Sequence, residues 1–170
     1  VVAPAVFMDT EKIDIEEWRE SHPNWAELQR LIDDFEQTDW VSFHADWHMS
    51  SQMLVALQSG RVVGYLRYVV QAIGVEEDEP AVTLRDQELT EGKVIAFGVK
   101  VERRRQGIGR RLQSRLIDEC KAKRCFQIRS HSSPENQANH ALKLSMGFAM
   151  HVLVREQGKA GAYFLLPLRE

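Results

Sequence analysis

The chain has 170 residues, of which 44% are hydrophobic and 28% charged, and its formal net charge is −3 at pH 7. This length suits one domain with its own hydrophobic core, and the composition excludes a disordered chain. The mildly acidic balance argues against a surface that binds nucleic acid as a whole. We therefore expect a single domain over residues 1–170.

Two features predict where the protein works. Cys120 and Cys125 are read as small buried residues in a reducing compartment rather than as a disulfide or a metal site. No apolar run reaches the roughly 20 residues that a membrane-spanning helix needs, and the first residues lack the pattern of a signal peptide. These features predict a cytoplasmic protein without a membrane partner.

The first 50 residues carry two helical patterns and one aromatic segment. A short strand is expected within the first ten residues, at Ala5–Met8. Apolar residues between 13 and 35 recur at helical spacing, which predicts a short helix around Ile15 and Trp18 and a second helix from 25 to 37 with Asn24 as its N-cap. Residues 40–50 are rich in aromatic and histidine side chains. We interpret them as a loop or short strand, because no recognisable metal-ligand spacing appears.

The middle of the chain predicts a hairpin and then a central strand. Residues 52–57 and 61–70 are apolar runs joined by a turn at Gly60, and the acidic run 76–80 reads as a solvated loop. The strand expected from 94 to 101 has large residues on one face, which we assign to the core. Ala96 and Gly98 lie on the other face, where their small size leaves room for a close approach to the backbone. An amphipathic helix from about 108 to 123 follows.

The last third predicts a strand, a helix and a closing hairpin. We expect a strand at 126–129 and then a helix with Ser133 as N-cap and Pro134 in its first turn. The face of this helix that we expect to pack inward consists of Ala138, Ala141, Leu142, Ser145 and Met146. The opposite side carries Asn136, Asn139, His140 and Lys143. With strands at 148–154 and 162–168, the element order predicts a mixed sheet with helices on both faces.

The turn between the central strand and its helix is electrostatically unusual. Five arginines fall within residues 103–111, and Arg110 and Arg111 occupy the first helical turn. Cations there cost roughly 0.3–1 kcal/mol each, because the helix N-terminus already carries partial positive charge. An anion held by the exposed N–H groups and the guanidinium groups would reverse that cost. The turn therefore predicts a phosphate-bearing ligand.

Three other kinds of phosphate-binding site are alternative interpretations of this turn. A P-loop requires a Gly-x-x-x-x-Gly-Lys string, which the chain lacks. A dinucleotide-binding turn has three glycines near the first strand, whereas this turn has two and lies past the middle of the chain. An arginine-rich helix that reads nucleic-acid phosphates stays open, but the net charge and the lack of a second basic or aromatic patch argue against a nucleic-acid partner.

Two segments together resemble one known family. Arg104-x-x-Gly107-x-Gly109 follows a strand and opens a helix, which resembles the acyl-CoA pyrophosphate loop of the GNAT superfamily of N-acetyltransferases. The later segment from Asn136 through Ala138, Ala141 and Leu142 to Gly147-Phe148 resembles the second shared segment of that superfamily. The resemblance extends from about residue 52 to residue 168.

The resemblance implies a fold and an activity. The fold would be α/β, with a mostly antiparallel sheet of six to seven strands and helices on both faces. The activity would be transfer of an acetyl group from acetyl-CoA, by direct attack, to a primary amine of a small molecule or a protein. No metal would take part. The superfamily also implies backbone contacts to the acetyl and pantetheine groups from the central strand and to the pyrophosphate from the turn. The implied cofactor-binding residues are Val99, Lys100, Val101, Arg104, Arg105, Gln106, Gly107, Ile108, Gly109, Arg110, Asn136 and Lys143.

The proton-transfer groups depart from the superfamily's pattern. Many members have a Tyr where this chain has Lys143, and a Glu near the position of Ile95. We name Glu91, Lys143 and Asn136 as the candidate catalytic residues, with Glu88 and His131 as further candidates for a base. Tyr65 and Tyr68 would line a substrate groove or belong to the core.

These departures leave the function with an alternative. A non-catalytic acyl-CoA-binding regulatory domain would need neither the Tyr nor the Glu. The acidic loop before the central strand hints at a cationic acceptor, but such loops also serve solubility. A homodimer is left open.

Overall fold

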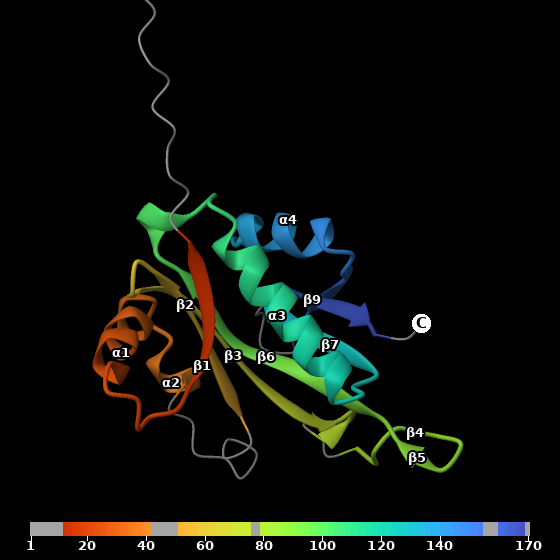
Figure 1. The fold of residues 1–170 in the computed structure, drawn as a ribbon. Coiled ribbons are helices and arrows are strands. Elements are labelled where there is room, and N and C mark those ends of the chain that lie inside the picture. The colour runs from red at the N-terminus through yellow and green to blue at the C-terminus, as the bar shows by residue number, and fades with distance from the viewer. Residues whose placement is uncertain (1–11, 42–50, 76–78, 155–159, 169–170) are drawn as a thin grey trace, which may run out of the picture.

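The computed structural model describes residues 12–41, 51–75, 79–154 and 160–168, which form a seven-stranded sheet, a two-stranded ribbon and the helices around them (Figure 1). In chain order the elements are β1 (Ile13–Trp18), α1 (Trp25–Asp34), α2 (Thr38–Val41), β2 (Gln52–Gln58), β3 (Arg61–Ala72), β4 (Thr83–Leu84), β5 (Gln87–Glu88), β6 (Thr90–Val99), α3 (Ile108–Ala122), β7 (Gln127–Ser132), α4 (Gln137–Ser145), β8 (Ala149–Val154) and β9 (Ala160–Pro167).

The large sheet is mixed but mostly antiparallel. Its strand order is β1-β2-β3-β6-β7-β9-β8, and β6 and β7 are its parallel pair. The helix α3 connects these two strands, as a parallel connection requires. The predicted fold class is confirmed.

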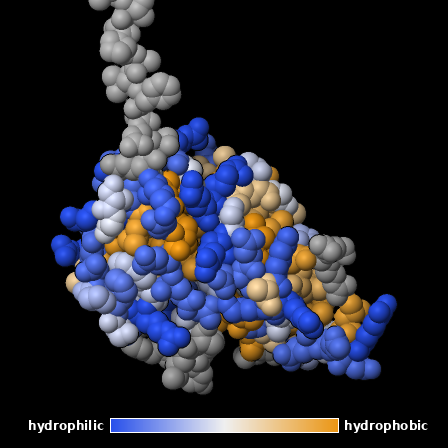
Figure 2. All heavy atoms as spheres, in the orientation of Figure 1, coloured by the Kyte–Doolittle hydropathy of each residue, from blue (hydrophilic) through white to orange (hydrophobic). Residues whose placement is uncertain are grey.

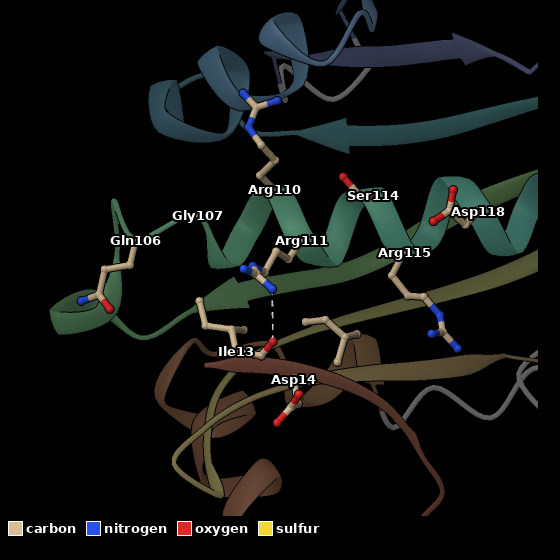
Figure 3. A pocket seen from close by; sticks show the side chains of 10 residues that line it. Ile13, Asp14, Gln106, Gly107, Arg110, Arg111, Ser114, Arg115 and Asp118 are labelled. Carbon is tan, nitrogen blue, oxygen red and sulfur yellow. Dashed lines mark hydrogen bonds between the residues drawn. The ribbon is translucent and has the colours of Figure 1, made fainter. Parts of the chain in front are cut away.

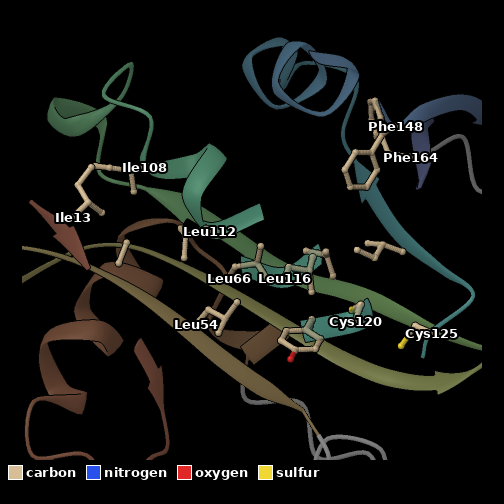
Figure 4. Packing of buried hydrophobic residues seen from close by; sticks show 14 of the residues in the cluster. Ile13, Leu54, Leu66, Ile108, Leu112, Leu116, Cys120, Cys125, Phe148 and Phe164 are labelled. Atoms are coloured by element: carbon tan, nitrogen blue, oxygen red, sulfur yellow. The ribbon is translucent and has the colours of Figure 1, made fainter. Parts of the chain in front are cut away.

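Helices cover both faces of this sheet. On one face the core contains Ile108, Leu112 and Leu116 of α3 together with Phe148 and Phe164 beneath α4 (Figure 4). On the other face a second core gathers around Leu28, Leu31 and Ile32 of α1. Cys120 and Cys125 are buried and unbridged, as predicted.

The first predicted helix is wrong, because residues 13–18 form β1. This strand pairs antiparallel with β2 along its whole length. Ile13 packs in the core beneath α3, whereas Trp18 packs in the core beneath α1. Side chains of opposite parity therefore reach opposite faces, as strand geometry requires. Ile15 and Trp18 are three residues apart, a spacing that also fits one turn of a helix.

The helix α4 begins later than predicted and packs with a different side. Asn136, not Ser133, is its N-cap, and the Asn136 side chain accepts a hydrogen bond from the backbone of Asn139. Ala138, Ala141 and Ser145 are exposed. The polar side that we expected to face outward turns partly inward, and Lys143 on it is completely buried.

Smaller differences concern the ends of elements. The central strand β6 begins at Thr90 and ends at Val99, and Val101 lies in a 3₁₀ turn that spans Val101–Arg103. The ribbon of β4 and β5 was not predicted. The hairpin of β2 and β3 and the helix α3 are confirmed. The expected strand at 5–8, most of the aromatic segment 40–50 and part of the acidic run 76–80 lie outside the described residues.

On the face of the molecule shown in Figure 2, the surface along α3 is polar. Figure 2 shows hydrophilic residues along the exposed side of α3 and apolar residues beyond it, toward α4 and β9. No helix among the described residues is long and apolar enough to cross a membrane.

Candidate active site

The central feature of the site is an opening between β6 and β7. The two strands pair from Glu91 opposite Gln127 to Val94 opposite Ser130, where the ladder ends. Beyond that point β6 continues to Val99 along β3, and β7 continues to Ser132 along β9. The strands therefore part at residue 95, and the far half of β6 has no strand on the β7 side among the described residues.

Backbone groups of Phe97 and Val99 point into this opening. The N–H of Lys100 donates to Val63 of β3, so by strand alternation residues 97 and 99 direct their N–H and C=O groups away from β3. Their carbonyl oxygens accept side-chain donors, Gln37 Nε2 at 3.4 Å for Phe97 and Arg104 Nε at 3.2 Å for Val99. The N–H groups of these two residues point the same way, and no strand of the described residues pairs with them there, so they could bind a ligand that lies along the strand.

The small residues of β6 do not leave an empty space. A Cβ atom on Gly98 would lie 3.0 Å from the rings of Phe35 and Tyr65. Ala96 is buried in the core beneath α1. The close approach that we predicted at this face is therefore made by the protein's own aromatic rings.

The turn after β6 has two residues in the left-handed backbone region and leads directly into the start of α3. Gly107 is the N-cap of α3 with φ of +82°, and a Cβ atom there would meet nothing within 4 Å. Arg105 also has a positive φ, +64°, which is strained for a residue with a side chain. The first N–H groups of α3 have no acceptor within the helix, so they remain available where the helix dipole is positive.

The arginine side chains spread around this turn. Arg110 donates to the Ser145 hydroxyl on α4 at 2.7 Å, and Arg111 donates to the carbonyl of Ile13 on β1 at 3.3 Å. Between β1 and α3 the surface forms an open groove of about 640 Å³ (Figure 3), lined in part by Gln106, Arg111 and Arg115. Positive charge therefore borders the helix start on both sides.

Gly109 has a packing role in this arrangement. A Cβ atom on it would lie 3.1 Å from Leu142 of α4 and 3.2 Å from Phe97 of β6. A larger residue would push α3, α4 and the open strand apart. The second glycine of the motif thus keeps the helix start close to the opening.

Lys143 lies in an apolar position between the two helices. Its side chain has no exposed surface, and its Nζ is 3.5 Å from Oε1 of Gln113 and 4.8 Å from the centroid of the Phe148 ring. Gln113 is also fully buried, and its Nε2 has no acceptor among the described residues. Burial lowers the pKa of Lys143 from 10.5 to about 7. At neutral pH both protonation states are populated.

Glu91 lies at the closed end of the β6–β7 pair. Its buried carboxylate accepts from Arg129 Nη2 at 2.7 Å, from Gln127 Nε2 at 2.9 Å and from Gln71 Nε2 at 3.2 Å. A base must accept a proton from the substrate, and these donors already occupy both oxygens. Its catalytic role stays a prediction, and its contacts favour a structural role.

The other candidates occupy three different environments. His131 lies on the part of β7 beyond the ladder with β6, and its exposed ring contacts the edge of Tyr163 at a centroid distance of 5.3 Å. Asn136 is exposed at the start of α4, and Glu88 is exposed on β5. Tyr65 and Tyr68 are buried, and their hydroxyls donate to Gln37 and Gln52. The structure thus makes both tyrosines core residues.

No group of His, Cys, Asp and Glu side chains among the described residues could hold a metal ion. The site instead combines a parted parallel strand pair with a glycine turn and a helix N-terminus, an arrangement suited to an extended phosphate-bearing ligand.

The comparisons with known proteins define the family. The sequence matches the acetyltransferase (GNAT) family over residues 12–148, so the chain belongs to that family. No curated protein sequence matches it.

Solved structures with low sequence identity share the fold. The ribosomal-protein-S18-alanine N-acetyltransferase from Escherichia coli is 17% identical with a TM-score of 0.65, over 94% of this chain and 96% of that one. NAA60 from Arabidopsis thaliana in complex with acetyl-CoA is 14% identical with a TM-score of 0.69, over 92% and 99%. Ard1 from Thermoplasma volcanium is 16% identical with a TM-score of 0.65, over 93% and 99%.

Proposed function

We propose that this acetyltransferase moves the acetyl group of acetyl-CoA to a primary amine of a small molecule or a protein by direct attack. The observation that carries the proposal is the parting of β6 and β7 beside the glycine turn. Acetyl-CoA would bind along β6, with its pyrophosphate at the amides between Arg105 and Arg110.

The open strand supplies the electrostatic part of the reaction. The N–H of Val99 would donate to the acetyl carbonyl oxygen and stabilise the negative charge that develops there when the amine attacks. Lys100 and Val101 would continue the binding surface toward the turn, and Arg104 would flank the pyrophosphate. The N–C bond forms as the C–S bond breaks, and the sulfur accepts a proton as it departs, so CoA leaves as a thiol.

Lys143 is the proposed proton donor to the departing sulfur. A lysine with an ordinary pKa would hold its proton too firmly, but burial lowers the pKa of Lys143 to about 7. A pKa near the working pH suits a general acid. Asn136, at the start of the same helix, would contact the cofactor through its amide.

His131 is the proposed base. It is the one histidine among the candidate bases. It lies on β7 just past the point where β6 and β7 part, and its ring is exposed. The ring would take a proton from the ammonium form of the substrate, and the neutral amine would then attack and release its second proton to solvent as the N–C bond forms. Glu91 is not part of this proposal, because its oxygens are taken by Arg129 and two glutamines.

The acceptor in this proposal is a primary amine of a protein or of a small molecule. The similar Escherichia coli enzyme is named as an N-acetyltransferase of an alanine of ribosomal protein S18, which supports a peptide amine as the acceptor. A non-catalytic acyl-CoA-binding domain is the second candidate, because this chain has Lys143 and Ile95 where the superfamily often has Tyr and Glu.

Thiol release from acetyl-CoA separates these candidates. The panel contains polyamines, aminoglycosides and short peptides with free or blocked N-termini. An enzyme gives amine-dependent release of CoA and an acetylated product in the mass spectrum. A melting temperature raised by acetyl-CoA without turnover on any amine would favour the binding domain.

A further inference from the structure

The outer strand β8 has the features of an interface. It lies at one end of the seven-stranded sheet, so one of its edges has no strand partner among the described residues. Its sequence, AMHVLV, contains no Asp, Glu, Lys, Arg or Pro. Met150 is 48% exposed and Val152 is 68% exposed. An edge of this kind is a template for pairing with another strand.

The other end of the sheet shows how an edge is protected. The outer strand there is β1, which carries Asp14, Glu16 and Glu17 among its six residues. Charges on an edge strand prevent pairing with a second strand, because like charges would face each other. β8 carries no such charges in its sequence, and no described strand pairs with its outer edge.

An apolar surface adjoins the unprotected edge. Met150 pairs with Phe164 and Val152 pairs with Ala162, and both partners are buried beneath α4. Met150 and Val152 therefore lie on the α4 face of the sheet. Leu144 of α4 is also 48% exposed. Exposed apolar residues thus occur both on this strand and on the helix that covers the same face.

We propose that β8 pairs antiparallel with β8 of a second copy of this chain, which joins the two sheets across a twofold axis. Self-pairing requires a surface that is complementary to itself, and β8 meets this requirement because it has no Asp, Glu, Lys or Arg side chain to face the same residue of the second copy. A pairing centred on His151 sets Met150 opposite Val152 of the second copy. This interface is independent of the acetyl transfer.

The size of the contact sets its expected strength. A six-residue strand with a small apolar flank lies near the lower end of specific interfaces. We therefore expect a dimer that dissociates on dilution within the range of about 1 to 200 µM. Sedimentation equilibrium over this range measures it on the full chain.

Val152→Glu tests the surface, because it sets a carboxylate of each copy beside the twofold axis. We expect this variant to sediment as a monomer at the highest concentration, with unchanged circular dichroism because Val152 is exposed. The matched control is Val75→Glu, since Val75 is 51% exposed and lies outside β8. It should dimerise like the wild type. Met150→Lys repeats the test should Val152→Glu fold poorly.

Three outcomes would overturn the proposal. They are a wild-type protein that is monomeric at about 200 µM, a Val152→Glu or Met150→Lys variant that dimerises as well as the wild type, and a Val75→Glu control that loses the dimer equally.

Discussion

The amine of Lys143, the buried residue of α4, lies 4.8 Å from the centroid of the Phe148 ring. Phe148 directly follows Gly147, so the ring next to the end of the helix packs against the buried amine. The contact with the ring partly offsets the cost of burying the ammonium group, because the ring face is electronegative. Gln113 adds one long hydrogen bond. The result is an amine whose pKa is lowered to about 7.

Replacing Lys143 with Met keeps most of the volume and removes the proposed acid. We expect kcat to fall by about 10²-fold or more, the usual contribution of general acid catalysis. In the wild type kcat should also fall as the pH rises above about 7, because the lysine then loses its proton. The variant should lack this fall. The pH profile of kcat is the measurement. If Lys143→Met shows the same fall above about pH 7 as the wild type, Lys143 is not the acid.

The same residue should make stability depend on pH. The pKa of Lys143 is about 7 in the folded state and near 10.5 in the unfolded chain, so between these values the unfolded chain binds more protons. Stability should therefore rise with pH in this window, by up to about 1.4 kcal/mol per pH unit. Urea denaturation at pH 7 and pH 9 measures the slope. Lys143→Met should lose this part of the slope, and equal slopes in both proteins would show that the buried amine is not responsible.

His131→Gln tests the proposed base. The variant keeps a polar side chain but cannot take the proton, so kcat/KM at pH 7 should fall by about 10²-fold. The deficit should shrink at higher pH, where more of the amine substrate is already deprotonated in solution. His151→Gln, at another exposed histidine, is the control and should retain wild-type activity. A pH-independent deficit, or none, would remove His131 from the mechanism.

Glu91→Gln separates a structural role from a catalytic one. The change leaves the Arg129 guanidinium, whose side chain is only 15% exposed, without its carboxylate. Breaking a buried ion pair on one side costs about 3–5 kcal/mol, so the free energy of unfolding should fall by that order. At a temperature where the variant is folded, kcat should be close to that of the wild type. A large loss of kcat with little loss of stability would restore Glu91 as the base.

Much of the fold follows from local patterns in the sequence. The helix α3 and the hairpin of β2 and β3 have clear periodicity and turn residues, and both were predicted correctly. The start of the chain was misread because the spacing of Ile15 and Trp18 is compatible with one helix turn. Pairing with β2, far away in sequence, decides in favour of a strand.

The orientation of α4 could not be predicted from its own residues. Alanines such as Ala138 and Ala141 appear apolar but bury little area, so they do not determine how the helix rolls. Its rotation follows contacts with distant residues, such as Asn139 with Ser132 of β7 and His140 with Phe164 of β9. These contacts turn Lys143 inward. The position of the glycine turn before α3 was visible in the sequence, but the burial of Lys143, the proposed acid, was not.

The most direct test of the account is calorimetric titration of acetyl-CoA into Gly107→Val and Gly60→Val. Both glycines have positive φ, +82° and +73°, and a Cβ atom at either would meet nothing within 4 Å. The two changes thus impose similar backbone strain, at the proposed pyrophosphate turn and at the β2–β3 turn. We predict that Gly107→Val loses measurable binding while Gly60→Val binds like the wild type. Wild-type affinity in Gly107→Val would contradict the assignment of this turn to the cofactor.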